Sequence, residues 1–370
     1  MKNSVKFSLL HIILLSMTVI GLKNHVTILP PILDVAKRDG WMSVILGAVL
    51  IIPWLFLLSF MNKKTQDQPF VEWLNNQLGK KVSVVLRVII AIFLMLLCAF
   101  TLKELTQWGG TTFLPRTPVV LCLFIYVVLC TLLAIAGIQT LVIINVIVLS
   151  GVIVLGFFVA FVNIQVKDYE LLRPFFEHGI QPILHGSLYP AAGYVELLIF
   201  FFVHHKVKSR IKFKHYVVML LLLMGLTTGP LIGAIIEFGP TEAAKQRYPA
   251  YEQWGLVYIG RFIEHLDFFS IYQWMTGAFI RISFLLYVAS ELLNIQNDSK
   301  KVWTFIAAPF TIMCLLLLLI GDQAFLTING HFFLVFTLIF FFVLGIFLAL
   351  LALKTKKSSK ERKGLGLHVE

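Results

Sequence analysis

Long apolar runs separated by short polar segments repeat from one end of the chain to the other. Each run is about 20 residues long, which is the length a helix needs to cross the hydrocarbon core of a bilayer. Because backbone polar groups in lipid must be paired within the segment, helix is the expected form of each run. The runs span about residues 8–31, 41–61, 82–107, 118–137, 139–163, 186–204, 214–237, 266–294, 302–321 and 331–353. The pattern predicts an all-α polytopic membrane protein with ten transmembrane helices.

The polar segments between the runs are too short to form a separate soluble domain. We therefore expect residues 1–370 to be one integral membrane domain, with a first repeat at about 8–163, a second at about 186–353 and a basic tail at 354–370. The segment 69–78 (PFVEWLNNQL) predicts a short amphipathic helix at an interface. No small-residue cleavage site follows the first run, so we expect that run to be retained as a span rather than removed as a signal peptide.

Composition excludes an ordinary soluble enzyme. Hydrophobic residues make up 59% of the chain and charged residues only 14%, whereas soluble proteins carry about 25% charged residues. The sequence has no glycine-rich dinucleotide motif, P-loop or nucleophile elbow, so we expect neither catalytic activity nor a cofactor. The four cysteines all lie within apolar runs, where a disulfide framework is not expected.

The net charge of +12 reflects membrane topology rather than binding to nucleic acid. If the N-terminus is cytosolic, twenty lysines and arginines lie on the cytosolic side and eight on the other side. This asymmetry agrees with the positive-inside rule and with an even number of spans. We expect both termini in the cytosol, and no nucleic-acid partner.

Two of the ten predicted spans carry interruptions. Residues 21–25 (GLKNH) place polar groups inside the first run, and Pro30 and Pro31 follow; residues 189–194 (YPAAGY) place a proline and a glycine inside the sixth. Interrupted helices at corresponding positions of two five-helix repeats point to a transporter-type site near the midplane. The alternative is that these residues only kink the helices for packing. The candidate ligand-binding residues are Gly21, Leu22, Lys23, Asn24, His25, Tyr189, Ala191, Ala192, Gly193, Tyr194 and Glu196.

Ionisable residues inside the predicted spans are the second indication of a site. A charge at the bilayer centre costs ~2.5–3.5 kcal/mol on insertion scales, so such residues usually face a partner or a wet cavity. Lys23 and Glu196 either pair with each other or each face a zwitterionic ligand. Further candidates for intramembrane charge partners are Lys103, Glu104 and Arg281. The alternatives are interfacial positions for Lys103 and Glu104, and for Arg281 a structural salt bridge.

A basic segment follows the sixth span. Lys206, Lys208, Arg210 and Lys212 are candidates for docking a cytosolic partner domain. The adjacent His204 and His205 point to different faces of a helix and have no accompanying carboxylate or cysteine, so we expect no metal site.

Two regions carry a resemblance to a known family. Residues 21–30 (GLKNHVTILP) with 39–41 (DGW), and residues 247–254 (RYPAYEQW) with 262–274 (FIEHLDFFSIYQW), resemble the endospore germination permease family, the B subunits of spore nutrient-germinant receptors in the amino acid–polyamine–organocation superfamily. The resemblance covers essentially the whole chain.

This resemblance implies a LeuT-like 5+5 inverted repeat with broken helices 1 and 6, located in the inner membrane of a spore. It also implies assembly with an A-type subunit and a lipoprotein C-type subunit, and recognition of a small nutrient such as an amino acid or a sugar. The first break departs from the wider superfamily because it carries Lys23 and His25, and a lysine amine there argues against sodium dependence.

Three functions remain open from the sequence. The first is a sensor that binds a nutrient at the broken helices and shifts a conformational equilibrium, which triggers germination. The second is a secondary transporter of amino acids or amines, with proton coupling through Glu196 or Lys23. The third is an architectural subunit whose basic loops dock a partner.

Overall fold

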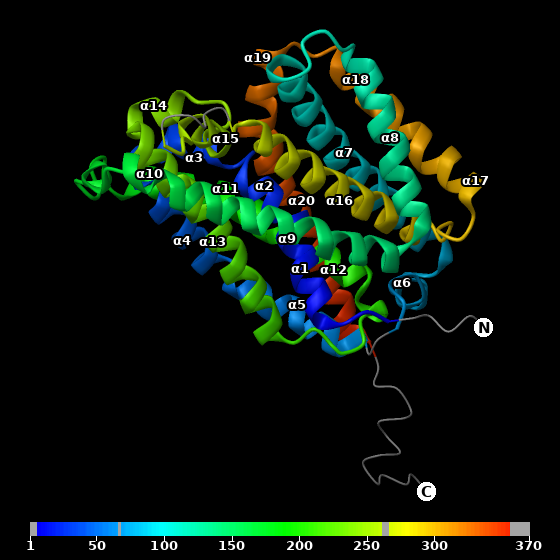
Figure 1. The fold of residues 1–370 in the computed structure, drawn as a ribbon. Helices are drawn as coiled ribbons and strands as arrows, with labels where there is room; N and C mark the ends of the chain where they lie inside the picture. Colours follow the sequence, from blue (N-terminus) through cyan, green and yellow to red (C-terminus); the bar gives the residue numbers. More distant parts are fainter. Residues whose placement is uncertain (1–5, 66–67, 261–265, 356–370) are drawn as a thin grey trace, which may run out of the picture.

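The computed structural model describes residues 6–65, 68–260 and 266–355, and it is a bundle of helices (Figure 1). Within these residues, nine helical stretches are long and apolar enough to cross a membrane, and Leu9–His25 is a shorter apolar one. Together they account for the ten predicted spans, so the predicted all-α architecture is confirmed. The predicted basic tail lies, from residue 356 on, outside the described residues, as do residues 261–265 of the second resembling region.

The first five spans are built from α1 (Leu9–Val19), α2 (Gly21–His25) and α3 (Leu29–Ala36); α4 (Gly40–Leu50) and α5 (Ile52–Thr65); α7 (Lys80–Thr112); α8 (Val119–Ala136); and α9 (Ile138–Val162). The last five are built from α10 (Ile180–Gly186), α11 (Leu188–Tyr194) and α12 (Ile199–Phe202); α13 (Phe213–Phe238); α16 (Phe268–Leu292); α17 (Ser299–Val302) and α18 (Ala308–Leu318); and α19 (Asp322–Thr327) and α20 (Leu334–Lys354). The remaining short helices are α6 (Phe70–Leu78), α14 (Pro240–Lys245) and α15 (Pro249–Glu252).

Span 1 is segmented as predicted, but its interruption lies elsewhere. Gly21–His25 is helical, and the wider break falls at residues 26–28, where the Ile28 amide donates to the Lys23 carbonyl five residues back (3.2 Å). Pro30 and Pro31 lie in the first turn of α3, where backbone amides have no partner within the helix. The prolines therefore mark where the helix restarts, and the break precedes them.

In span 6, too, the proline lies in the first turn of a helix. The predicted break at 189–194 is helical, because Pro190 is the third residue of α11 and again falls in a first turn. The interruptions are Ser187, between α10 and α11, and the 3₁₀ turn Val195–Leu198 that separates α11 from α12. Both spans are thus broken, but at the borders of the segments that the sequence indicated.

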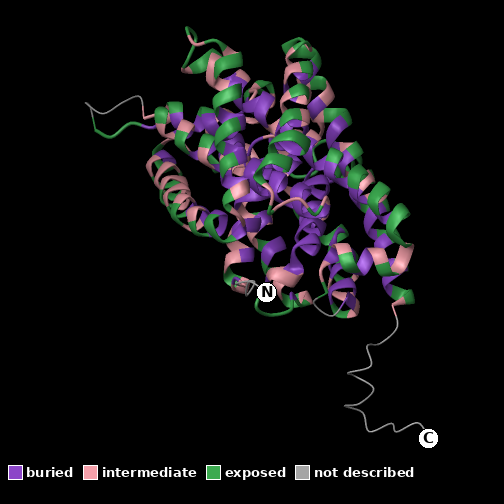
Figure 2. Cartoon of the chain, turned by 90° about the vertical axis from the view of Figure 1, so that its right-hand side faces the viewer, coloured by how far each residue is buried: buried purple, intermediate pink, exposed green. Residues whose placement is uncertain are grey.

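Spans 6 and 8 lie inside the bundle, whereas span 5 lies at its surface. In their most apolar stretches, 78% of Ile180–Phe202 and 83% of Phe268–Leu292 is buried, against 17% of Ile138–Val166. Figure 2 shows the buried positions gathered in the interior and the exposed ones around it. Helix α1 of span 1 packs against α16 of span 8, and in span 6 α11 contacts α2 while α12 contacts α16. Spans 1, 6 and 8 therefore meet in the interior.

The start of α1 and the end of α20 lie at the same end of the bundle (Figure 1). Near the N-terminus, the Phe7 amide donates to the Lys206 carbonyl (3.1 Å), and the Lys208 amide donates to the Phe7 carbonyl (2.8 Å). Near the C-terminus, the Trp73 indole of α6 donates to the Thr355 hydroxyl (3.1 Å). The predicted amphipathic helix is present as α6, and it lies at this end of the bundle. We call this the terminal end of the bundle and the opposite one the distal end.

Candidate functional site

Three charged side chains from three different spans meet in the interior. Lys23 comes from α2, Glu196 from the 3₁₀ turn of span 6, and Arg281 from α16. The Lys23 ammonium lies 2.8 Å from Glu196 Oε1, and Arg281 Nη1 lies 2.9 Å from Glu196 Oε2. All three are buried, with exposed side-chain fractions of 6%, 0% and 2%. We call this group the central charge cluster.

Backbone carbonyls complete the coordination of the two cations. Lys23 also donates to the Ala192 carbonyl (3.4 Å), and Arg281 donates to the Val19 carbonyl and, through Nε, to the Thr101 hydroxyl (3.3 Å). The cluster therefore ties together spans 1, 3, 6 and 8. Lys23 and Glu196 were expected either to pair with each other or to face a ligand separately, and in the structure they pair directly. Arg281, for which a structural salt bridge was one alternative, pairs with the same carboxylate.

The central charge cluster carries one more positive than negative charge. A buried ion without an opposite charge is costly, so the excess needs a nearby anion. The next buried carboxylate is Glu104 in α7, which interacts electrostatically with both Lys23 and Arg281 and accepts a hydrogen bond from Thr27 (2.8 Å). Thr27 belongs to the break in span 1, so Glu104 lies on the distal side of the cluster.

Spans 1 and 6 are closely packed at Gly193. A Cβ atom on Gly193 would lie 1.8 Å from Oδ1 of Asn24, whose Nδ2 donates to the Thr227 hydroxyl of α13 (3.2 Å). The Asn24 side chain thus fills the space in front of Gly193, and only glycine leaves room for it. A ligand at this junction must displace side chains that pack here.

Not every candidate residue faces this junction. Lys23, Asn24, Ala192, Gly193 and Glu196 are brought together, whereas five others contact neighbouring helices. Three of them make packing contacts: Gly21 with Leu226, Leu22 with Gly277, and Ala191 with Gly47. The other two make hydrogen bonds: a ring nitrogen of His25 with the Leu226 carbonyl (3.1 Å), and the Tyr189 hydroxyl with the His331 ring (3.2 Å). The buried Tyr194 hydroxyl interacts with the Thr227 side chain of α13.

Lys103 has a different role from its neighbour Glu104. Its ammonium donates to the Leu317 and Ile320 carbonyls (2.7 and 2.5 Å) at the end of α18, and it lies 4.4 Å from the centre of the Phe325 ring. Lysine is well suited to this position because the last carbonyls of a helix lack partners within the helix. Lys103 therefore acts as a helix cap, whereas it was predicted as a candidate intramembrane charge partner or an interfacial residue.

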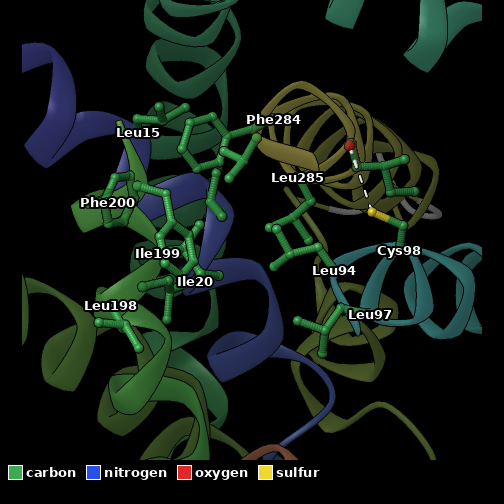
Figure 3. Close-up of a cluster of buried hydrophobic side chains, with 14 of the residues drawn as sticks. Leu15, Ile20, Leu94, Leu97, Cys98, Leu198, Ile199, Phe200, Phe284 and Leu285 are labelled. Carbon is green, nitrogen blue, oxygen red and sulfur yellow. Dashed lines mark hydrogen bonds between the residues drawn. The ribbon is translucent and has the colours of Figure 1, made fainter. Parts of the chain in front are cut away.

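Buried apolar side chains from four spans pack together beside the central charge cluster in the sequence of each span, and Figure 3 shows several of them in contact. They are Leu15 and Ile20 of span 1, Leu94 and Leu97 of span 3, Leu198, Ile199 and Phe200 of span 6, and Phe284 and Leu285 of span 8, each at most 2% exposed. In every one of these helices the apolar residues lie closer to the terminal end than the polar residue of the cluster.

Some residues of the basic segment after span 6 form ion pairs within the chain, and others are exposed. Lys206 pairs with Glu291 of α16 (2.9 Å), and His205 lies 3.4 Å from the same carboxylate. Lys206 is thus bound within the chain, in contrast to the prediction that it docks a partner, because Glu291 reaches the same end of the bundle. Lys208, Arg210 and Lys212 are exposed. Across the described ranges, no group of three or more histidine, cysteine, aspartate or glutamate residues is arranged to hold a metal ion.

The fold and the cluster define a permease-like multi-pass membrane protein. Mhp1, a nucleobase-cation-symport-1 family transporter solved in a closed conformation with bromovinylhydantoin bound, superposes with a TM-score of 0.59. The match covers 89% of this chain and 77% of Mhp1 at 11% sequence identity, so it concerns the fold alone.

The sequence relatives are more specific. The family model described as "Spore germination protein" matches residues 3–326, and the chain belongs to this family. Spore germination protein XB of Bacillus anthracis is 36% identical, covering 96% of this chain and 99% of that protein. The putative spore germination protein YfkT of Bacillus subtilis is 27% identical (80% and 81%), and spore germination protein KB of that species is 21% identical (72% and 74%).

Proposed function

We propose that this chain is the nutrient-sensing membrane subunit of a spore germinant receptor. A small nutrient, an amino acid or a sugar, binds where spans 1 and 6 meet and thereby triggers germination. The observation that supports this proposal is the central charge cluster, which links spans 1, 6 and 8 through one carboxylate. Residues 8–163 and 186–353 form the two repeats of the fold, and the cluster joins them.

The proposed mechanism is a shift between two arrangements of the bundle. In the closed arrangement, Asn24 and the Lys23–Glu196 pair occupy the junction between spans 1 and 6. A ligand that supplies its own polar groups there competes for these contacts and favours an arrangement in which the two spans separate. It shifts the equilibrium only by its difference in affinity for the two states. The partner subunits then read out the change.

Replacement of Lys23 by methionine tests this mechanism. Methionine keeps most of the side-chain length but cannot bridge Glu196 and the Ala192 carbonyl, whereas Arg281 still neutralises Glu196. We expect the nutrient concentration for half-maximal germination of intact spores to change by on the order of tenfold or more, since a hydrogen bond between charged groups contributes about 1.5–3 kcal/mol. Lys300→Met, at an exposed lysine of α17, is the matched control and should germinate like the wild type.

The same variants separate sensing from the alternative, a proton-coupled transporter of amino acids or amines. A sensor requires no net movement of solute, so proteoliposomes containing the wild-type chain should not accumulate labelled nutrient under a proton gradient. Accumulation against a gradient, abolished by Lys23→Met, would instead establish transport. If Lys23→Met spores with normal amounts of the subunit respond like the wild type, the ligand site is not at this junction.

We further propose that the chain lies in the spore inner membrane with both termini cytosolic, and that it assembles with an A-type subunit and a lipoprotein C-type subunit. The exposed Lys208, Arg210 and Lys212 dock an acidic surface of a cytosolic partner domain. Charge reversal of all three to glutamate should reduce co-purification of the A-type subunit by on the order of tenfold, because like charges then face each other. Lys300→Glu is the control on the same side, and equal recovery with both variants would disprove docking through this segment.

A further inference from the structure

An open groove runs between spans 2 and 10 on the outside of the bundle. It has a volume of about 360 Å³, and all seven lining residues are apolar: Phe56, Leu57 and Phe60 of α5, and Ile346, Ala349, Leu350 and Leu353 of α20. Its base is buried and its rim is exposed, since Ala349 is 9% exposed, whereas Phe56 and Leu353 are 57% and 61% exposed. We call this feature the α5–α20 groove.

The α5–α20 groove opens toward the terminal end. The two helices are in close contact at Gly345, where an added Cβ atom would overlap the Trp54 ring. The residues that line the groove follow Trp54 and Gly345 along the two helices. Helix α20 ends at the terminal end, and so does α5, whose Thr65 is hydrogen-bonded to His204 (3.1 Å), two residues before Lys206. The groove therefore lies between the helix contact and the membrane surface at this end.

Two lysines lie at the terminal mouth of the groove. Lys64 is one turn beyond Phe60, and its ammonium lies 5.8 Å from the centre of the Phe60 ring. Lys354 directly follows Leu353 and is exposed. Neither α5 nor α20 contains an acidic residue, and within the described ranges neither lysine forms an ion pair. The mouth of the groove thus carries two positive charges that the chain does not neutralise.

The shape of the groove fits an acyl chain better than a transmembrane helix. A helix with its side chains is about 10–12 Å across, so the length between Ile346 and Leu353, about 10 Å, occupies on the order of 900 Å³. That is more than twice the volume of the groove. Packed helix interfaces in membranes are also rich in small residues, whereas only Ala349 of the seven lining residues is small. A narrow, flexible hydrocarbon chain meets neither obstacle.

We propose that the α5–α20 groove binds one anionic phospholipid. One acyl chain lies along the apolar lining, and the headgroup phosphate is held by the ammonium groups of Lys64 and Lys354. Lysine is a common phosphate ligand in proteins, and basic residues at the membrane surface attract anionic lipids. The site is on the outside of the bundle, away from the junction of spans 1 and 6, and does not depend on the proposed function.

The competing explanation is that bulk lipid fills the groove without selection. The lysines then follow only the positive-inside rule, and every exposed lysine at this end contributes equally to lipid binding. Lys80 and Lys81, at the start of α7, are two such exposed lysines, and none of their sequence neighbours lines the groove. Their replacement is therefore the matched control for any change at Lys64 and Lys354.

The test titrates the detergent-solubilised full-length protein with dioleoylphosphatidylglycerol or dioleoylphosphatidylcholine and measures the melting temperature. The two lipids have the same acyl chains, and only the first carries a net negative charge. A ligand that binds the folded protein alone raises its melting temperature. Half-maximal stabilisation of the wild type should need about 10-fold or more less phosphatidylglycerol than phosphatidylcholine, since each basic residue near the surface strengthens the attraction about fivefold.

Variants of the two lysines test the headgroup contact. Lys64→Gln combined with Lys354→Gln should raise the phosphatidylglycerol concentration by about 10- to 30-fold and abolish the preference over phosphatidylcholine. Lys80→Gln combined with Lys81→Gln removes the same charge and should keep the preference. The ratio of the two lipids is read within one variant, so a general loss of stability does not mimic the expected result.

A bulky residue at the base of the groove tests the acyl-chain contact. Ala349→Phe places a ring where the chain lies, so both lipids should be needed at about 10-fold higher concentration, because contacts with several methylene groups are lost. Val154→Phe adds a ring at a 66%-exposed position of α9 that does not line the groove, and it should leave both concentrations unchanged. The lysine variants keep the test decisive if Ala349→Phe does not fold.

Four outcomes would overturn the inference. Three concern the headgroup: a wild-type protein without a preference for phosphatidylglycerol, a Lys64 and Lys354 double variant that keeps the preference, and a Lys80 and Lys81 double variant that loses it equally. The fourth is an Ala349→Phe protein that responds to both lipids like the wild type but no longer co-purifies with the A-type subunit. That result would assign the groove to a helix of a partner chain.

Discussion

Glutamine in place of Glu196 is expected to destabilise the protein by about 3–5 kcal/mol, the cost typical of removing one partner from a buried ion pair. Glu196 is the only carboxylate in direct contact with Lys23 and Arg281 among the described residues. Its loss leaves two buried cations near each other and doubles the excess positive charge of the central cluster. Thermal denaturation of the detergent-solubilised protein measures the effect, and we expect the nutrient response of spores to be lost with it.

A surface carboxylate provides the control for this loss. Glu242 pairs with Lys245 at 2.7 Å, but both side chains are more than 60% exposed. Because exposed ion pairs contribute little, Glu242→Gln should change stability by no more than about 0.5 kcal/mol. Similar melting temperatures for the Glu196 and Glu242 variants would mean that the cluster is not a stabilising link between the spans.

Replacement of Gly193 by alanine is expected to lower the stability of the protein considerably, although it adds only one methyl group. Its Cβ would lie 1.8 Å from Oδ1 and 2.7 Å from Cγ of Asn24, so Asn24 must move and lose its bond to Thr227, or spans 1 and 6 must separate. Overpacking of this kind typically costs about 1–3 kcal/mol. The melting temperature should fall, and the equilibrium between closed and open arrangements should change, which basal germination without nutrient measures.

A double variant and a matched glycine make this prediction specific. Asn24→Ala removes the three atoms that would lie nearest to a Cβ at position 193, so Gly193→Ala should cost much less in that background. Gly225 in α13 has no other atom within 4 Å of an added Cβ, and Gly225→Ala should be neutral or stabilising by up to about 1 kcal/mol. If both glycine variants behave alike, close packing of spans 1 and 6 at Gly193 is disproved.

The helical architecture could be predicted from the sequence because the length of an apolar run shows whether a helix can cross the membrane. Each apolar run of about 20 residues became a span, and the amphipathic pattern at 69–78 became α6. The breaks were predicted in the correct spans but displaced by a few residues. A proline disrupts a helix only beyond its first turn, and the sequence alone does not reveal which turn Pro30 or Pro190 occupies.

The site was less predictable because its contacts join distant spans. Intramembrane charge identified Lys23, Glu196 and Arg281 individually, since isolated charges in lipid are costly. That one carboxylate serves both cations depends on how spans 1, 6 and 8 cross, which apolar periodicity does not encode. Lys206 was misjudged for the same reason, because Glu291 lies in another span.

The central charge cluster also constrains how the protein is made. Glu196 is synthesised 173 residues after Lys23, which at about 5–20 residues per second corresponds to a delay of roughly 10–35 s. During that interval the first helix leaves the translocon with an unneutralised ammonium, at a cost of ~2.5–3.5 kcal/mol. The direct partner of Lys23 therefore enters the membrane only with the second half of the nascent chain. A chain that terminates before the sixth helix lacks this counter-ion.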